Sequence, residues 1–287
     1  MIPGQFAYHR PKTLAEAAKI LASDDGARAI AGGHSLLPMM KLRVAAPSAL
    51  VDLQGIEALK GISKAEKTLV IGAMTTQHEL LSSALVKKHA PILIETAQVI
   101  ADPQVRYVGT VGGNVANGDP GNDMPAVMLA LDATYVLGGR GKARRVKARA
   151  FYTGTYETAL KEGELLTAIE IPIAGKHGFA YEKLKRKVGD YATAAAAVLV
   201  TLKAGKVASA EVTLTNLGPT PLRAEAAAQA LVGKASGDEA AIAAAVSAAR
   251  QIMDPANDTR GTPEYRRSVG GVMVDRAIRR ALAVAQG

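Results

Sequence analysis

The stretch YVGTVGGNVANGDPGNDMPA, residues 107–126, holds five glycines, two prolines and three asparagines. This composition argues against a regular helix or strand, because each glycine allows positive φ or a close backbone approach to a ligand. The apolar run 126–130 follows, with Pro125 at the expected first helical position. A glycine-rich loop that leads into a helix presents unpaired N–H groups, the usual basis for holding a phosphate. A long ordered connector is the alternative for this loop taken alone.

A second glycine pair lies near the start of the chain, in Ala31-Gly32-Gly33-His34-Ser35. The apolar residues 27–30 before it resemble a buried strand, and residues 36–43 after it have helical spacing. Strand, glycine pair and helix again form an anion-holding turn. Neither GxGxxG nor a Walker A sequence occurs in the chain, so a Rossmann fold is disfavoured.

Length and composition restrict the class of protein. A chain of 287 residues with 48% hydrophobic and 4% aromatic residues is expected to form two domains with aliphatic, alanine-rich cores. The absence of cysteine excludes disulfides, iron–sulfur ligation and thiol catalysis within this chain. The five histidines lack metal-ligand spacing, so no metal site is expected. No secretory signal or membrane span is visible, which favours a cytoplasmic protein.

The net charge of +9 gathers in two basic runs, residues 140–149 and 183–187. Nucleic-acid binding would use such runs, but recognition of single strands also needs interleaved aromatic residues, and these runs have none. A solvated face or a docking surface for an acidic partner is the preferred interpretation.

The remaining patterns predict a mixed chain with a domain boundary at residues 174–178. Capping boxes at Thr13 and Thr76 open helices, and the pair Asp102-Pro103 is expected to end one. The run 192–202 has helical propensity from its alanines, but its alternation and the following turn favour a strand. Expected helices cover 13–21, 36–43, 78–89, 92–100, 224–232, 239–252 and 263–285. Expected strands cover 49–53, 69–73, 134–137, 144–147, 165–171, 179–184, 192–202 and 206–216, mainly antiparallel in the first domain.

Taken in order, five segments together with the two glycine pairs resemble a known family. They are MIPGQFAYHRP, IGAMTTQHEL, IADPQVRYVGTVGGN, ANGDPGNDMPA and YEKLKRKVGDYATAAAA. Over essentially its whole length the chain is similar to the FAD-binding medium subunit of the molybdenum hydroxylases, the relatives of xanthine oxidase. The resemblance implies an α+β chain. Residues 1–175 would form a two-part FAD-binding domain of the vanillyl-alcohol-oxidase/PCMH type, with subdomains of about 1–55 and 56–175. Residues 178–287 would form a smaller domain of short antiparallel sheet and helices.

The resemblance also implies the cofactor contacts. Both glycine loops would hold the FAD pyrophosphate through backbone amides, with side-chain donors from Ser35 and Asn114. Asp123 would bond the sugar portion, Ile100 and Tyr191 would line the flavin ring, and Leu166 (backbone) and Lys183 match more loosely. The implied residues are Ala31, Gly32, Gly33, His34, Ser35, Ile100, Val111, Gly112, Gly113, Asn114, Val115, Asp123, Leu166, Lys183 and Tyr191.

Three of these residues have other interpretations. From the sequence alone, Asp123 is equally a helix N-cap, and Tyr191 is an ordinary tyrosine at the edge of a core. His34 lies in a GGHS sequence that also occurs in flavoproteins with a covalent histidyl flavin. The resemblance to the molybdenum hydroxylases implies noncovalent FAD, and His34 is then a hydrogen-bonding or packing residue.

Three functions follow from these patterns. The resemblance implies an oxidoreductase subunit without a catalytic residue of its own. It would pass electrons from [2Fe–2S] clusters on a small partner to an external acceptor such as a quinone. A large partner would carry the molybdenum cofactor, and the heterotrimer would dimerise in the cytoplasm, peripheral to the inner face of the membrane. A self-contained flavin oxidoreductase and a basic module for phosphate or nucleic acid remain the alternatives.

Overall fold

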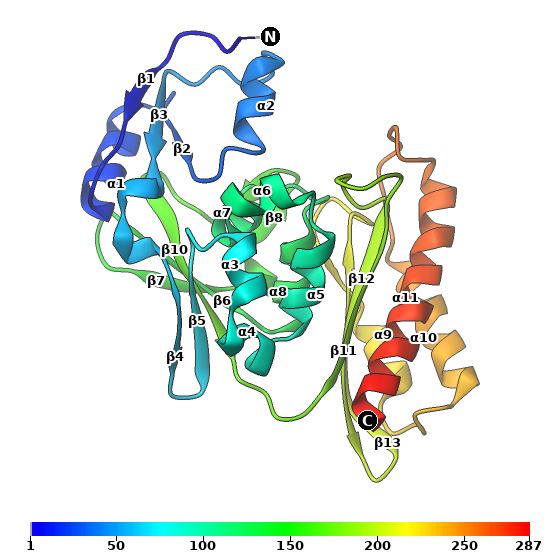
Figure 1. Cartoon of the computed structure of the whole chain (residues 1–287). Helices are drawn as coiled ribbons and strands as arrows, with labels where there is room; N and C mark the ends of the chain where they lie inside the picture. Colours follow the sequence, from blue (N-terminus) through cyan, green and yellow to red (C-terminus); the bar gives the residue numbers. More distant parts are fainter. Residues whose placement is uncertain (1) are drawn as a thin grey trace.

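The computed structural model describes residues 2–287, and the chain begins with a small parallel sheet (Figure 1). Its elements are β1 (Ala7–His9), α1 (Leu14–Ser23), β2 (Arg28–Ile30), α2 (Leu36–Lys41) and β3 (Ala49–Asp52). The strands pair in the order β1-β3-β2. A small core of its own, which includes Ala17 and Val51, lies beneath this sheet. The connection from β2 to α2 is the first glycine loop, so it leaves the carboxyl end of a parallel strand, where open parallel sheets bind ligands.

The second sheet is antiparallel and has the strand order β4-β5-β10-β6-β7. Its strands are β4 (Ile62–Ala65), β5 (Thr68–Gly72), β6 (Thr134–Gly139), β7 (Arg144–Lys147) and β10 (Glu164–Pro172). A hairpin of β8 (Tyr152–Gly154) and β9 (Glu157–Thr158) precedes β10. Six short helices connect β5 to β6: α3 (Gln77–Ser82), α4 (Ala84–His89), α5 (Ile92–Val99), α6 (Pro103–Val108), α7 (Val111–Ala116) and α8 (Asp123–Ala130).

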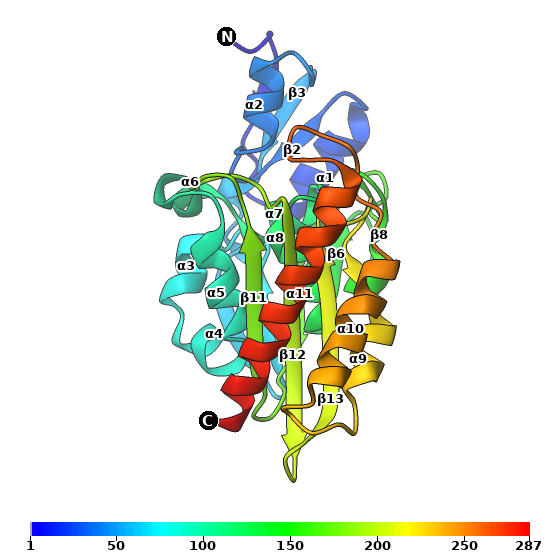
Figure 2. The same cartoon turned by 90° about the vertical axis from the view of Figure 1, so that its right-hand side faces the viewer.

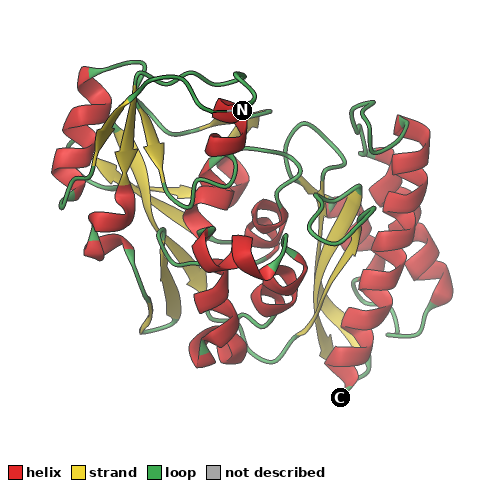
Figure 3. Ribbon diagram, turned by 45° about the horizontal axis from the view of Figure 1, so that its top comes forward, coloured by secondary structure: helices red, strands yellow, loops and turns green. Residues whose placement is uncertain are grey.

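The third sheet, β11-β12-β13-β14, is also antiparallel (Figure 2). Its strands are β11 (Gly178–Leu184), β12 (Ala194–Lys203), β13 (Lys206–Thr215) and β14 (Leu222–Arg223), and the helices after them are α9 (Glu225–Leu231), α10 (Glu239–Gln251) and α11 (Pro263–Gln286). Helices α5 and α8 pack on one face of this sheet, and helices α9 and α11 pack on the other, with α10 against both of them. The short helices therefore form a layer between the second and third sheets (Figure 3).

The place of the central strand β12 between two layers of helices explains the alanine run at its start. Ala195 and Ala197 face the core shared with the short helices, whereas Ala194 and Ala196 face the core under α11. A strand covered by helices on both faces must be apolar on both faces, and small side chains let those helices approach closely. The preference for a strand over a helix in this run is confirmed.

Several predicted elements agree with the structure. Thr13 and Thr76 both cap helices, and Thr76 forms a complete capping box with Glu79. The first domain's main sheet is antiparallel and its last strand ends at Pro172. The three helices of the tail are present within one or two residues of their expected bounds.

The region around residues 102–126 was predicted less well. The glycine pair of residues 112–113 lies inside the helix α7, although the composition argued against a helix there. Thr110 caps α7, and glycine is required at position 112 because an added Cβ would lie 2.5 Å from the carbonyl oxygen of Ala73. The pair Asp102-Pro103 ends α5 as expected, but it also starts α6, with Asp102 as the N-cap. The expected helix 78–89 is interrupted at Ser83, which caps α4.

No helix within residues 2–287 combines the length and the apolar character needed to cross a bilayer.

Candidate functional site

A cavity of about 1130 Å³ brings together segments that are far apart in the sequence. Its wall includes the first glycine loop, the start of α7, the end of α5 and the segment just before β12. Of the fifteen residues proposed as FAD contacts, all but Val111 and Val115 line this cavity. The side chains of these two valines are fully buried in the core beneath α7. The structure therefore collects thirteen of the residues in one place.

The first glycine loop leaves a run of backbone donors unused. None of the N–H groups from Gly32 to Leu36 is hydrogen-bonded to an acceptor within the described part of the chain. Gly33 has φ of +73°, a conformation that L side chains rarely adopt, and this turn directs the loop into α2. Successive free N–H groups at a helix start form a concave site for an anion. The loop fits the pyrophosphate role that the resemblance implies.

The second glycine loop differs from this expectation. The Val111 and Gly112 N–H groups donate to Thr75 O and Ala73 O, at 2.8 and 2.9 Å. The Gly113 N–H donates to Thr110 Oγ1 at 3.0 Å, and the Asn114 N–H donates to Thr110 O at 3.1 Å. The amides of residues 111–114 are therefore already paired, because α7 needs them for its cap and for its attachment to β5. These amides already have acceptors within the chain, so their contact with the pyrophosphate stays a prediction, and this loop can also contribute close packing and side chains.

The two loops touch each other directly. A Cβ added to Gly32 would collide with the carbonyl oxygen of Val108 and lie 2.7 Å from the Cα atom of Gly109. Glycine at position 32 is thus required for the first loop to lie against the chain that leads into α7. The contact fixes the spacing of the two cavity walls.

Asn114 connects α7 to the start of α8. Its side-chain oxygen accepts from the Met124 N–H at 3.2 Å, and its carbonyl oxygen accepts from Asn122 Nδ2 at 2.8 Å. Asn122 is the N-cap position of α8, so Asp123 is the first helical residue and its interpretation as an N-cap is wrong. Pro125 is accordingly the third helical residue rather than the first.

Asp123 forms a buried ion pair with Lys183. The carboxylate accepts from Lys183 Nζ at 2.8 Å and from the Tyr181 hydroxyl at 2.6 Å, and both charged side chains are almost fully buried. Burial raises the pKa of Asp123, and Lys183 and Tyr181 work against that rise. Both carboxylate oxygens are thus engaged, and the pair fastens α8 to β11 at the cavity wall. A contact of Asp123 with a cofactor sugar would use a remaining lone pair.

Three other predicted residues line the cavity at separate points. Ile100 follows α5, Leu166 lies at the irregularity where β10 pairs with β6, and Tyr191 lies in the loop between β11 and β12. Tyr191 is 36% exposed and lines the cavity, which fits both a tyrosine at the edge of a core and a cofactor contact. Burial raises the pKa of its phenol, and Ser35 and Arg260 work against the rise.

Two polar residues of the cavity wall were not anticipated. Gln77 Oε1 and Asn117 Nδ2 are buried without a hydrogen-bond partner within residues 2–287. Unpaired buried polar atoms are uncommon in proteins and indicate that a partner belongs nearby. No sequence signal marks either residue, because Gln77 simply follows a capping threonine and Asn117 ends α7. Free amides, a cavity and unpaired polar atoms together fit a large, polar, phosphate-bearing cofactor such as FAD.

The basic runs are less available than the sequence suggests. Arg144 and Arg145 pair with Glu164 and Glu170, and Lys147 and Arg149 both pair with Asp132. In the second run, Lys183 is buried against Asp123 and Arg186 pairs with Asp190. The ion pairs offset part of this charge, but Arg145, Arg149 and Arg186 remain about half exposed, so a solvated face is retained.

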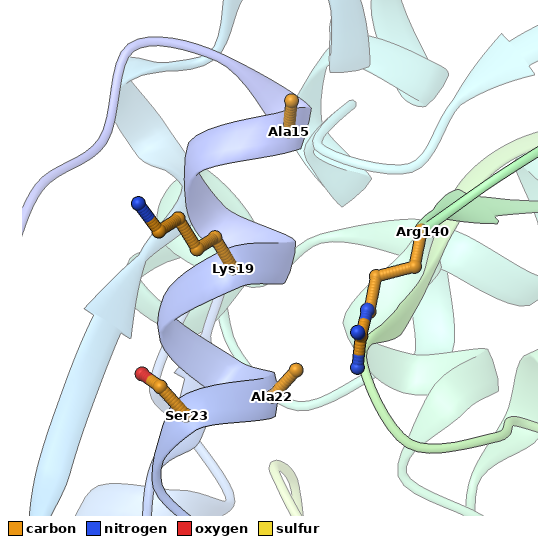
Figure 4. A pocket seen from close by; sticks show the side chains of 5 residues that line it. All are labelled: Ala15, Lys19, Ala22, Ser23 and Arg140. Atoms are coloured by element: carbon orange, nitrogen blue, oxygen red, sulfur yellow. The ribbon is translucent and has the colours of Figure 1, made fainter.

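A second hollow, of about 270 Å³, lies beside α1 near Arg140 (Figure 4). It contains no predicted site residue, and its charged side chains, Lys19 and Arg140, are both basic. Within residues 2–287, no group of three or more histidine, aspartate or glutamate side chains is placed to hold a metal ion. The large cavity is therefore the candidate site.

Comparisons with known proteins agree with this site. Residues 4–174 match the model of the FAD binding domain in molybdopterin dehydrogenase, and residues 179–281 match the carbon monoxide dehydrogenase flavoprotein C-terminal domain. The chain is 55% identical to the carbon monoxide dehydrogenase medium chain of Afipia carboxidovorans, over 100% of both chains. It is 47% identical to the medium chain from Hydrogenophaga pseudoflava, over 99% of both.

A solved structure shows the same fold. The chain superposes on a chain of reconstituted carbon monoxide dehydrogenase from Oligotropha carboxidovorans with a TM-score of 0.97, at 55% identity, over 99% of this chain and 100% of that one. The five quoted segments favour the same member of the molybdenum hydroxylases, and the comparisons confirm that preference. The chain belongs to the FAD-binding medium subunits of the molybdopterin dehydrogenases, of the carbon monoxide dehydrogenase type.

Proposed function

We propose that this chain holds FAD noncovalently in the large cavity and relays electrons within a carbon monoxide dehydrogenase. A small partner would deliver them from [2Fe–2S] clusters, and an external acceptor such as a quinone would take them up. A large partner with the molybdenum cofactor would oxidise the substrate. The heterotrimer would dimerise, and a quinone acceptor would bring it to the inner face of the membrane.

The observation that carries the proposal is the run of free N–H groups from Gly32 to Leu36 on the cavity wall. When bound there, FAD would supply the chemistry that amino-acid side chains lack, namely the exchange of electrons between donors and acceptors. The chain's own residues would do the rest. The first loop would bind the pyrophosphate, the paired Asp123 would lie beside a sugar, and Ile100 and Tyr191 would hold the ring in one orientation.

Partner capture and electron transfer test this function. When the chain is expressed together with its natural partner subunits, it should co-purify with two further proteins. Mass spectrometry of the native complex should then identify a molybdenum-containing large subunit. In that complex, carbon monoxide should bleach the flavin absorption, whereas the isolated 287-residue chain should not oxidise it. Rapid substrate oxidation by the isolated chain would contradict the subunit role.

The flavin should be released by acid. His34 lies in a GGHS sequence but the rest of the chain resembles proteins with noncovalent FAD, and the free amides of the first loop give binding without a covalent bond. We expect acid precipitation of the purified chain to leave the yellow colour in the supernatant. Flavin retained in the washed pellet would show a covalent link, and His34→Ala would then abolish that retention.

Replacing Tyr191 should separate cofactor binding from electron transfer. Tyr191→Ala leaves the first loop intact, so most FAD should remain bound. The lost ring contact is worth about 1 kcal/mol beyond the buried area, enough to loosen the flavin ring. In the assembled complex, substrate should still reduce the molybdenum and iron–sulfur centres, while transfer to the external acceptor should slow. Unmodified turnover with full FAD occupancy would assign Tyr191 a purely structural role.

A further inference from the structure

Tyr191 lies in a loop that cannot hold its side chain alone. Residues 185–193 between β11 and β12 form turns and bends, and the Tyr191 backbone is held locally through Asp190. Its ring instead contacts residues from distant segments. A Cβ added to Gly121 would lie 3.1 Å from Tyr191 Cδ1, and the guanidinium carbon of Arg260 lies 5.6 Å from the ring centroid. The ring's orientation therefore depends on contacts made across the fold.

Arg260 lies over the Tyr191 ring but outside the cavity lining. Tyr191 lines the cavity, whereas Arg260 is not among the residues of the cavity wall. A guanidinium within about 6 Å of a ring centroid attracts the ring electrostatically through its face. Arg260 Nε is buried and has no hydrogen-bond partner within the described residues, so this nitrogen contributes no competing contact. The cation is placed to hold Tyr191 against the cavity.

The position of Arg260 is itself fixed by the core. Asp258 accepts from the Arg260 backbone N–H and from Arg260 Nη1, both at 2.8 Å. Asp258 also pairs with Arg266 at 3.3 Å, and the side chain of Arg266 is 1% exposed. Arg266 Nε donates to Thr193 O at 3.2 Å, two residues after Tyr191. One buried arginine of α11 thus anchors both the Arg260 turn and the chain that carries Tyr191.

We propose that Arg260 is a positioning residue that holds the Tyr191 ring over the bound flavin. This inference rests on the proposed function, because it requires FAD in the cavity beside Tyr191. Arg260 does not line the cavity, so it would act through the ring and not on the cofactor directly. Without the guanidinium, the ring would leave its position over the flavin for part of the time.

Flavin fluorescence of the FAD-loaded chain tests this inference. A tyrosine ring in contact with a flavin quenches its fluorescence, so Arg260→Met should increase the emission per bound flavin. Loss of a cation–π contact at a partly exposed site changes the ratio of held to displaced Tyr191 ring by about two- to fivefold. The flavin emission should change in that range. The matched control is Arg267→Met, because Arg267 is bonded to Met253 and Asp254 rather than to Tyr191. The control should retain the emission of the unmodified chain.

A double-mutant cycle decides whether Arg260 acts through Tyr191. Tyr191→Ala alone should increase the emission, and adding Arg260→Met to it should produce no further increase. Arg260→Lys should restore part of the quenching, because an ammonium also attracts a ring. An unchanged emission in Arg260→Met, or an equal increase in the Tyr191→Ala background, would overturn the inference. An assembled, unmodified complex that purifies without FAD and binds none on addition would instead refute the proposed function, and the inference with it.

Discussion

Gly33→Val is expected to abolish FAD binding while the fold is retained. Gly33 has φ of +73°, and a β-branched side chain strains that conformation by roughly 1–2 kcal/mol. Relaxing the strain would turn the free N–H groups of the first loop away from the cavity. Each charge-assisted hydrogen bond to a phosphate is worth about 1.5–3 kcal/mol, so losing two weakens binding roughly a hundredfold or more. The ratio of flavin to protein absorbance after purification measures the result.

Gly205→Val is the matched control. Gly205 has φ of +75° in the turn between β12 and β13, and an added Cβ would meet nothing within 4 Å. The backbone strain in Gly205→Val is thus nearly equal to that in Gly33→Val, but Gly205 is not on the cavity wall. Both variants should lose stability to urea, Gly33→Val somewhat more because its Cβ would also lie 3.0 Å from Leu37 Cδ1, and only Gly33→Val should lose FAD. Equal flavin content in the two variants would show that Gly33 serves only the turn of the chain.

Local signals in the sequence were sufficient for most of the fold. The threonine caps at positions 13 and 76 and the alternation in β12 each act within a few residues, and the structure has the elements they predict. The segment around α7 was different because its helix depends on a distant contact. Gly112 is helical where α7 packs against Ala73 at the end of β5, and no pattern within residues 107–126 indicates that contact.

The candidate site, like the fold, could be predicted from the sequence only in part. Its residues could be named from the motifs, but the state of their hydrogen bonds could not. The amides of Gly32 and Gly112 look alike in sequence, yet only the second has an acceptor, because β5 lies next to α7. Likewise, Arg260 is about 70 residues from Tyr191 in the chain, and only the anchoring of its turn by α11 brings the two together.

Lys183→Met should cause the largest loss of stability among the substitutions considered. It leaves the Asp123 carboxylate buried with one side-chain hydrogen bond, from the Tyr181 hydroxyl, and the weaker attraction of Lys185 as its remaining stabilising contacts. Removing one partner of a buried ion pair costs about 3–5 kcal/mol. The urea midpoint of the FAD-free chain should fall accordingly at neutral pH, and α8 should separate from β11 first because the pair joins them. A midpoint within error of the unmodified chain would show that water replaces Lys183.

The pH dependence and a double variant identify the cause of this loss. Burial raises the pKa of Asp123 from 3.8, and Lys183 opposes the rise, so Lys183→Met should raise the pKa further. A carboxyl with a higher pKa in the folded state gains protons on folding. Its stabilising effect is therefore complete below 3.8 and is lost as the pH rises through the folded-state pKa. The variant should accordingly be less impaired in mild acid than at neutral pH.

Asp123→Asn combined with Lys183→Met removes both charges and should recover most of the urea midpoint, because no unpaired charge remains buried. If the double variant is as unstable as Lys183→Met, the loss comes from packing of the lysine chain and not from the stranded carboxylate.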